Sequence, residues 1–328
     1  MKAIAITRPG GPEVLEIVDR EKPVPADGEI LVRVEAIGLN RPDVQQRRGL
    51  YPPPPNASDL PGLDIAGAVE AIGAGVDEAL LGMKVCALAN GGGYAEFCCV
   101  PAVQAMPIPK GLSMVEAASL PEVFFTAWNN VVWLGRLSHR EHLLVQGGTS
   151  GVGIAALQIA RHLFQAETYA TAGTEEKRAV CLELGAKAAV DYHDADWPDQ
   201  IRAAAGGKGM DMVLDGQAGP YTQQQLDLLD FDGRLVLLAS HLGEVSEVNT
   251  RALVRRRLTL TGSTLRPRPA EYKGRIACEL VSRVWPLIET GTIATRIHEV
   301  FDFDHMSAAH AMLDRNEQIG KIVVTVRC

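Results

Sequence analysis

Short apolar runs bounded by glycine and proline fill residues 1–120. Glu29–Ala36 and Lys84–Leu88 have the length and apolar content of strands, and the proline loop Leu50–Pro55 is typical of a structural connection. Closely spaced strands with such turn signals predict a barrel-like or mixed β domain. Further strands are expected at Met1–Ile6, Ala66–Ile72 and Tyr94–Val100.

The pattern changes near residue 121, where apolar strands begin to alternate with helical stretches. His142–Gln146 precedes a helix predicted over Gly151–Phe164, and the strand Thr168–Ala172 precedes a helix over Thr174–Leu184. This βαβ alternation predicts a doubly wound parallel sheet, and runs such as RLVLLAS suit strands that are covered on both faces. The other strands are expected at Ala188–Asp191, Met212–Asp215, Arg234–Ala239 and Thr259–Gly262, with helices at Trp197–Ala205 and Tyr221–Leu229.

The C-terminal segment continues no βαβ unit, so the simplest assembly returns it to the first domain. We therefore predict an α/β protein in which residues 1–121 and 267–328 form the mixed β domain. Residues 122–266 would form an inserted Rossmann domain. The C-terminal elements are expected at Glu271–Glu289 and Asp304–Arg315 as helices, and at Ile297–Val300 and Lys321–Val326 as strands.

Composition and charge narrow the function classes. The chain of 328 residues has a formal net charge of −8, which disfavours an extended nucleic-acid surface. No apolar stretch of about 18 residues occurs, and the N-terminus lacks the apolar core of a signal peptide. The chain is therefore expected to be cytoplasmic, without a membrane span. Six cysteines without a C-x-x-C pair and eight scattered histidines disfavour a disulfide framework and a zinc site.

The strongest chemical signal is the glycine-rich turn in HLLVQGGTSGVGIAALQIARHLF, residues 142–164. Such a turn lets the backbone approach a pyrophosphate, whose charge is stabilised at the N-terminus of the following helix. The spacing is not a strict G-x-G-x-x-G, but the strand before and the helix after favour a dinucleotide site over a tight structural turn. Gly148, Ser150, Gly151 and Val152 are the predicted cofactor contacts.

The end of the second Rossmann strand favours NADPH over NADH. An NAD site places Asp or Glu on the ribose about 20 residues after the turn, but here the strand tip carries Gly173. Lys177 and the phenol of Tyr192 could reach a 2′-phosphate by charge and hydrogen bonding. Glu175 and Glu176 leave a ribose contact, and hence NADH, open.

Several segments together resemble the medium-chain dehydrogenases/reductases, in the zinc-independent branch of quinone oxidoreductases related to zeta-crystallin. They include MKAIAITRPGGPEVLEI, AIGLNRPDVQQRRGLYPPPP, LPGLDIAGAVEAIGAGV, GGGYAEFCCVP, PEVFFTAW, the GGTSGVG turn and QIGKIVVTV. The pattern looks closest to the tumour-suppressor-inducible quinone oxidoreductases. The resemblance spans nearly the whole chain. It implies a GroES-like domain with an inserted Rossmann domain, NADPH as cofactor, and hydride transfer to a quinone.

The resemblance also bears on zinc. Zinc-dependent members of the family place a cysteine ligand in the region that reads Gly38–Arg41 here, and a His-Glu pair where this chain has Leu63–Asp64. Neither ligand type is present in these two segments. A metal that polarises an alcohol oxygen is therefore not expected, which favours reduction of a conjugated acceptor without a metal.

The same resemblance implies roles for individual residues. Asn40 matches an asparagine that lines the acceptor pocket and could donate to a quinone oxygen, although a turn-forming role is the alternative. Tyr51 matches a tyrosine at the pocket mouth that could position the acceptor or relay a proton, although packing on the proline loop is the alternative. Ser150 matches a serine near the cofactor. Thr126 is expected to start a helix near the nicotinamide, or simply to cap that helix.

Further cofactor contacts are implied along the second half of the chain. Gly216, at the end of a strand, would face the ligand crevice, and Ser240 would lie near the nicotinamide. His241 is interpreted as a surface histidine. Arg266 and Arg268 are interpreted as serving solubility or holding their loop. Leu265 would touch the carboxamide with its backbone, and Lys321 would supply a cation near the phosphates, beside a Gln318 that departs from the family asparagine.

Two other functions stay open at the level of sequence. One is NADPH-dependent reduction of the C=C bond of an enal or enone. The other, of a different class, is a crystallin-like NADPH- or RNA-binding protein, although the triplet Arg255–Arg257 suits a solvated helix end better than an RNA site. The resemblance also implies a homodimer or homotetramer, with Leu258–Gly262 at the interface. One- and two-electron reduction are not separated by the sequence.

Overall fold

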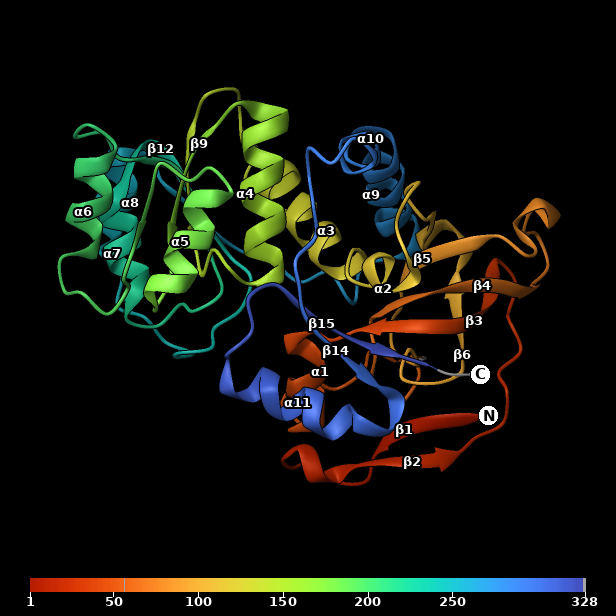
Figure 1. Cartoon of the computed structure of the whole chain (residues 1–328). Coiled ribbons are helices and arrows are strands. Elements are labelled where there is room, and N and C mark those ends of the chain that lie inside the picture. The colour runs from red at the N-terminus through yellow and green to blue at the C-terminus, as the bar shows by residue number, and fades with distance from the viewer. Residues whose placement is uncertain (56, 327–328) are drawn as a thin grey trace. The chain divides into compact units, whose positions relative to one another are not determined.

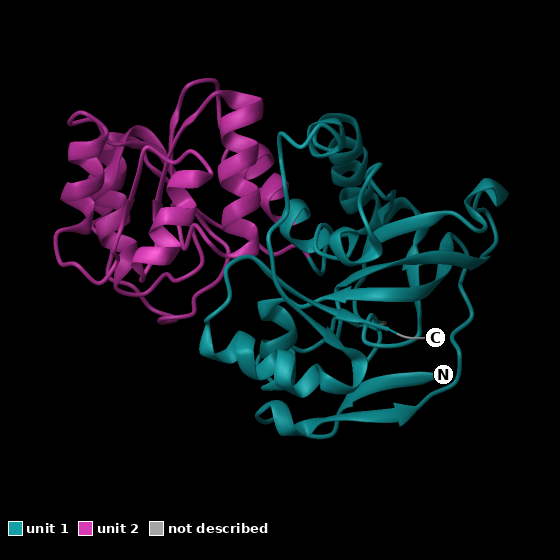
Figure 2. Cartoon of the chain, in the orientation of Figure 1, with its two compact units in different colours: residues 1–125, 266–328 teal, residues 126–265 magenta. Residues whose placement is uncertain are grey.

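The chain folds into two compact units. The computed structural model describes residues 1–55 and 57–326 (Figure 1). Unit 1 comprises residues 1–125 and 266–328, and unit 2 comprises residues 126–265, coloured teal and magenta in Figure 2. The chain enters unit 2 once and leaves it once, so unit 2 is an insertion into unit 1.

Unit 1 is built on one large, mostly antiparallel sheet and a two-stranded ribbon. Its strands are β1 (Lys2–Ile6), β2 (Leu15–Asp19), β3 (Glu29–Gly38), β4 (Asp64–Ile72), β5 (Lys84–Leu88), β6 (Phe97–Pro101), β7 (Ala105–Pro107), β14 (Ile297–Asp302) and β15 (Lys321–Thr325). The large sheet has the order β14-β15-β3-β4-β5-β7, β6 also pairs with β3, and β1 pairs with β2. The mixed β domain predicted from the sequence is confirmed, and β15 joins it from the far end of the chain.

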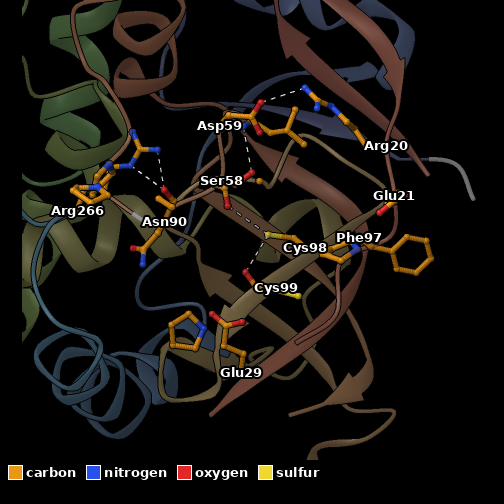
Figure 3. Close-up of a pocket in the computed structure, with 18 of the residues that line it drawn as sticks. Arg20, Glu21, Glu29, Ser58, Asp59, Asn90, Phe97, Cys98, Cys99 and Arg266 are labelled. Atoms are coloured by element: carbon orange, nitrogen blue, oxygen red, sulfur yellow. Dashed lines mark hydrogen bonds and ion pairs between the residues drawn. The ribbon is translucent and has the colours of Figure 1, made fainter. Parts of the chain in front are cut away.

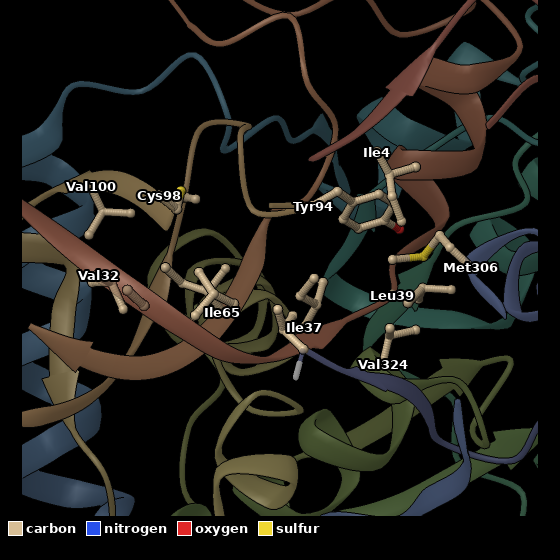
Figure 4. Close-up of a cluster of buried hydrophobic side chains, with 14 of the residues drawn as sticks. Ile4, Val32, Ile37, Leu39, Ile65, Tyr94, Cys98, Val100, Met306 and Val324 are labelled. Carbon is tan, nitrogen blue, oxygen red and sulfur yellow. The ribbon is translucent and has the colours of Figure 1, made fainter. Parts of the chain in front are cut away.

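The core of unit 1 packs on this sheet, as Figure 4 shows. Ile37 of β3, Ile65 of β4 and Val324 of β15 are fully buried, and Met306 joins them. These positions are apolar in sequence, and each buried side chain of this size contributes about 1.5–3 kcal/mol by leaving water. The sheet therefore holds β15 against β3 by packing as well as by its hydrogen bonds.

Proline divides the helix that the sequence predicts over Glu271–Glu289. The structure has two helices, which meet at Val284, and Pro286 lies in the first turn of the second. Proline lacks the N–H that an uninterrupted helix needs. Helices of unit 1 are α1 (Arg41–Arg47), α2 (Met114–Ala117), α3 (Pro121–Ala127, ending just inside unit 2), α9 (Ala270–Arg283), α10 (Trp285–Glu289) and α11 (Met306–Arg315), with short turns η1 (Pro12–Val14), η2 (Glu78–Leu80), η3 (Ala102–Gln104) and η5 (Phe303–His305).

Unit 2 is the doubly wound parallel sheet that the sequence predicts. Its strands are β8 (His142–Gln146), β9 (Glu167–Thr171), β10 (Ala188–Val190), β11 (Met210–Asp215), β12 (Leu229–Leu237) and β13 (Thr259–Gly262). They are all parallel and lie in the order β10-β9-β8-β11-β12-β13. Counted from β8 this is the Rossmann order 3-2-1-4-5-6, in which ligands bind beyond the carboxyl ends of the first and fourth strands. Those strands are β8 and β11.

Four helices of unit 2, which start at Gly151, Glu175, Trp197 and Tyr221, begin within one residue of the predicted positions. The arginine triplet ends α8: Arg256 donates to the carbonyls of Leu226 and Leu229, and Arg257 pairs with Asp232 at 2.6 Å. Two of the three arginines thus serve the fold. Among the described residues no helix is both long and apolar enough to span a bilayer. The helices are η4 (Trp128–Leu134), α4 (Gly151–Phe164), α5 (Glu175–Glu183), α6 (Trp197–Ala204), α7 (Tyr221–Leu228) and α8 (Thr250–Arg256).

Candidate functional site

The glycine-rich turn after β8 is closed by Ser150, the N-cap of α4. Its Oγ accepts a hydrogen bond from the N–H of Gly153 at 3.0 Å and donates to the carbonyl of Gly147 at 2.9 Å. Gly147 has φ +77°, a backbone conformation that favours glycine. The single O–H of Ser150 is therefore used within the turn. This geometry makes the Ser150 side chain a helix cap, and the roles expected for it at the cofactor stay predictions.

The other glycines of unit 2 differ in what surrounds them. A Cβ on Gly148 would lie 2.7 Å from Cβ of Ala170 and 2.8 Å from Sγ of Cys181, so this glycine lets the turn pack on β9. A Cβ on Gly216, beyond β11, would meet nothing within 4 Å. Gly216 thus presents open backbone at the carboxyl end of the sheet, whereas Gly148 is a packing residue.

Asp215 fixes the turn that presents Gly216. Its carboxylate accepts the N–H groups of Gln217 and Ala218, both at 2.8 Å. Burial raises the pKa of Asp215, and these N–H donors oppose that rise. The N–H of His241 donates to the carbonyl of Gly216 at 3.4 Å, so the loop of Ser240 lies beside this turn. The loops that follow β11 and β12 therefore lie side by side.

Two of the three residues expected to recognise a 2′-phosphate, Gly173 and Tyr192, lie together. A Cβ on Gly173 would lie 2.7 Å from the phenol oxygen of Tyr192, so the two are in contact. Lys177 is in the first turn of α5, where its N–H donates to Oγ1 of Thr174 at 3.2 Å. Sequence reasoning missed Arg178, one position further, which pairs with Asp191 at 2.7 Å.

Thr126 lies inside a continuous helical segment. The sequence-based expectation that it starts or caps a helix is wrong, because α3 begins at Pro121 and η4 follows at once. Its carbonyl accepts the side-chain N–H of Asn130 at 2.7 Å. The neighbouring Asn129 donates to Oγ of Ser263 at 3.1 Å, so η4 holds the segment that ends in Leu265.

In unit 1, sheet register brings three distant polar residues together. Gly38 of β3 faces Asp64 of β4, and Val323 of β15 also faces Gly38. Because β15 runs antiparallel to β3, Lys321 comes opposite Asn40, two residues beyond Gly38. The ammonium of Lys321 donates to Oδ1 of Asn40 at 2.5 Å, to Oδ2 of Asp64 at 2.9 Å and to the carbonyl of Leu39 at 2.8 Å.

This network uses every N–H of both its donor side chains. Nδ2 of Asn40 donates to Oδ2 of Asp64 at 2.9 Å and to the carbonyl of Gly38 at 3.3 Å. Asp64 also accepts the N–H of Glu122 at 2.6 Å, and Asn40, Asp64 and Lys321 are all buried. The expectations that Asn40 donates to an acceptor oxygen and that Lys321 faces phosphates are therefore revised. Both side chains hold the loop after β3 in place.

The two segments compared above with zinc-ligand regions do converge, but around a lysine. Gly38–Arg41 and Leu63–Asp64 meet at the ammonium of Lys321, so a side-chain cation occupies the centre of the network. Within residues 1–55 and 57–326, no group of three or more His, Cys, Asp or Glu side chains could hold a metal ion.

A second buried chain of hydrogen bonds ends one turn from Asn40. Nη1 of Arg47 lies 3.0 Å from Nδ1 of His310, whose Nε2 lies 2.9 Å from the phenol oxygen of Tyr94. Because a guanidinium only donates, Nδ1 accepts and Nε2–H donates. The Tyr94 hydroxyl is then free to donate to Asp43. Burial lowers the pKa of His310 to about 3, which keeps the ring neutral.

Tyr51 rests on a buried arginine. The Arg266 guanidinium lies 5.4 Å from the Tyr51 ring centre, at cation–π distance. Arg266 donates to the carbonyl of Asn90 from Nε and Nη2, at 3.0 and 2.8 Å, and to Oε1 of Gln46 at 2.9 Å. No local pattern indicates this role of Arg266, because its partners lie more than 170 positions away in the sequence.

Two family models match this chain. Residues 26–110 match the family model "Alcohol dehydrogenase GroES-like domain", and residues 151–282 match "Zinc-binding dehydrogenase". The chain is 31% identical to a quinone oxidoreductase of Lama guanicoe, over 100% of this chain and 98% of that protein. The chain belongs to the medium-chain dehydrogenase/reductase family, among the zeta-crystallin-like quinone oxidoreductases. It is an oxidoreductase.

Solved structures of this family superpose along the whole chain. The Escherichia coli quinone oxidoreductase, solved as a complex with NADPH, has a TM-score of 0.88 and 26% identity, over 99% of this chain and 100% of that one. The CurK enoyl reductase has a TM-score of 0.85 and 25% identity, over 99% of both chains. The GroES-like and Rossmann folds expected from the sequence are therefore confirmed.

The glycine contacts predict a difference in stability between two matched substitutions. Gly148→Ala should lower the free energy of unfolding by about 1–3 kcal/mol, because the new methyl group overpacks against Ala170 and Cys181. Gly216→Ala should leave stability nearly unchanged, because its Cβ meets open space. Denaturant unfolding of both variants checks this, and equal losses would contradict it.

The burial of Asp43 predicts that the stability of the fold depends on pH. Burial raises its pKa from 3.8 to about 6, against the N–H donors of Asn40 and Gly62. The folded state then holds the proton more tightly than the unfolded state. The stabilisation from this group, up to about 3 kcal/mol, is present at low pH and is lost as pH rises from about 4 to about 6.

Asp43→Asn removes this titration and also replaces one acceptor oxygen by an amide. The variant should therefore be less stable than the wild type near pH 4.5, and the gap should narrow as the pH approaches 7. Urea unfolding of both proteins across this range measures the gap. A gap that stays constant with pH would show that Asp43 does not titrate there.

Proposed function

We propose that this chain is an NADPH-dependent quinone reductase. The observation that carries the proposal is its full-length similarity to proteins named quinone oxidoreductase, at 31% identity over 98% of the Lama guanicoe protein. The NADPH complex of the Escherichia coli relative supports the choice of cofactor. The substrate class rests on the relatives and on the residues of unit 1.

The residues of unit 2 fit NADPH at three points. The partly exposed Gly151 and Val152 open α4, where a pyrophosphate would meet the helix N-terminus. Gly216 leaves room beside β11 for the adenosine ribose. Lys177 would supply a positive charge to the 2′-phosphate, and Gly173 and Tyr192 would line the site of this phosphate. When bound, NADPH supplies the hydride.

Unit 1 would position the acceptor and a proton. Reduction of a quinone to the hydroquinone takes up one hydride and one proton, and Tyr51 is the hydroxyl that we assign to donate the proton to the quinone oxygen. The network of Asn40, Asp64 and Lys321 would act as a rigid wall rather than as a donor. We propose that no metal takes part, because a lysine ammonium already occupies the centre of that network.

An assay with several acceptors tests this function. We expect NADPH oxidation, followed by absorbance, to require ortho- or para-quinones and to be faster than with NADH. Lys177→Ala should raise the KM for NADPH about tenfold, the cost of one charge-assisted contact, and leave the KM for NADH unchanged. Lys187→Ala, an exposed lysine beside Glu167, is the matched control. Equal use of NADH would instead implicate Glu175 or Glu176.

Gly216→Ala gives an independent reading of the cofactor site. Its fold should be intact, as predicted above, so a raised Kd for NADPH would report lost space beside β11. Unchanged NADPH binding would remove Gly216 from the site.

Reduction of an enal or enone C=C bond is the second candidate, favoured by the similarity to the CurK enoyl reductase. This reaction places a proton on carbon, so it depends more on an acid than quinone reduction does. Tyr51→Phe should therefore lower kcat more with an enone than with a quinone, in parallel assays with NADPH. Turnover of enones alone by the wild type would favour the second candidate.

Other expectations from the sequence stay predictions. A homodimer or homotetramer that pairs through the exposed edge strand β13 would be decided by the mass of the protein in solution. A cytoplasmic location is another of these predictions. RNA binding loses support, because Arg256 and Arg257 are engaged within unit 2.

A further inference from the structure

Unit 1 contains a pocket of about 900 Å³ that the proposed function does not yet use. Its walls include the loop of Ser58 and Leu60, the turn Asn90–Gly92, Cys98 of β6, and the segment Arg266–Arg268. Figure 3 shows Arg266 and Asn90 on one side of this pocket, and Arg20 with Asp59 on the other. The volume is within the range of small-molecule sites.

Two buried cations lie on this side of the pocket, and neither of them pairs with a carboxylate. Arg266 lines the pocket, and Lys273 lies behind it. Arg266 is 7% exposed and Lys273 is fully buried. Their partners are neutral oxygens: Arg266 donates to Asn90 and Gln46, and Lys273 donates to Oδ1 of Asn90 at 2.5 Å and to the carbonyl of Arg266 at 3.2 Å. Buried charges of one sign are costly unless an opposite charge offsets them.

Arg268 adds a third cation to this side. It is exposed, lines the pocket, and lies over the Tyr272 ring at 5.0 Å. Among the residues that the structure describes, no carboxylate lies within ion-pairing distance of Arg266, Arg268 or Lys273. Asp43 acts on Arg266 only through longer-range attraction.

Most charges on the opposite side of the pocket are already engaged. Arg20 pairs with Asp59 at 3.2 Å, and Asp19 pairs with Lys2 at 2.8 Å. Glu29 accepts the N–H of Ala26 at 3.1 Å. Glu21 and Glu29 also line the pocket and keep their negative charges, whereas the positive charge that no carboxylate pairs with lies at the Arg266–Arg268 side.

Arg266 has donors to spare. A guanidinium carries five N–H groups, and three are used on Asn90 and Gln46. One N–H remains on each terminal nitrogen, in a side chain whose face also supports Tyr51. Arg266 thus lines the pocket and also contacts the ring of Tyr51, the candidate acceptor residue.

We propose that the Arg266–Arg268 side of this pocket binds a carboxylate carried by the acceptor, so that the preferred acceptors are carboxylated aromatic or conjugated molecules. The inference rests on the proposed function, because it names the substrate class of that site. The carboxylate would supply the negative counter-charge that is missing beside Arg266 and Lys273.

Binding of two matched redox-inert probes tests the proposal without turnover. Titration calorimetry of the full chain should show 2-naphthoate binding about tenfold or more tightly than 2-naphthamide, as a charge-assisted contact predicts. The advantage of the carboxylate should shrink as salt rises from about 50 mM to about 500 mM, because ions screen it. Equal affinity for the two probes would overturn the proposal.

Two arginine variants locate the site within the pocket. Arg268→Gln should remove most of the preference for 2-naphthoate, and its exposed side chain makes misfolding a minor concern. Arg20→Gln, on the opposite side, is the matched control and should keep the preference. Equal losses in both variants would show that overall charge, not the Arg266–Arg268 side, is responsible, and would overturn the proposal.

The outcomes separate this proposal from the proposed function. A preference for 2-naphthoate that depends on Arg268, in a protein that reduces no quinone, would support the site and contradict the proposed function. Quinone reduction without that preference would support the function and overturn the carboxylate site.

Discussion

The ion pair between Lys321 and Asp64 is the constraint on which the arrangement of unit 1 depends. It joins the start of β15 to the start of β4, and Asn40 completes it. Removing one partner of a buried pair leaves an uncompensated charge, which costs about 3–5 kcal/mol. The loop from Gly38 to Arg41, the beginning of α1, and through Glu122 the beginning of α3 all depend on it.

This network also shows how the buried charge of Asp64 is balanced. A buried carboxylate needs a nearby positive charge, which a metal ion or an ammonium can supply. Here Lys321 supplies it with three directed hydrogen bonds. This network leaves no N–H of Asn40 or Lys321 for a ligand. The role that we propose for unit 1 is therefore assigned to Tyr51 and to Arg266, which lies against its ring.

In unit 2, backbone groups rather than side chains form the candidate site. The side-chain oxygen atoms of Ser150 and Asp215 accept hydrogen bonds from nearby N–H groups. These bonds fix the turns after β8 and β11. Gly216 then faces open space, whereas Gly148 faces β9. Similar glycines in one sequence thus serve opposite purposes, access in one case and close packing in the other.

The sequence by itself determined the elements whose signals are local. The βαβ alternation, the start of α4 at Gly151 and the position of β13 follow from periodicity and capping over a few residues, and the structure has them where they were expected. Gly173 and Tyr192 could also be paired from sequence, since both follow neighbouring strands of a parallel sheet. The short helices α1 and α2 were missed, because one or two turns show no reliable period.

Tertiary structure alone decided what the candidate side chains do. Lys321 lies 281 positions from Asn40, and Arg266 lies 220 positions from Gln46, so no local pattern could pair them. Only the register of β15 and β4 on β3 brings Lys321, Asn40 and Asp64 into contact. The physical reason is that a motif identifies which groups are available, whereas hydrogen bonds formed on folding determine which of their donors and acceptors remain for a ligand.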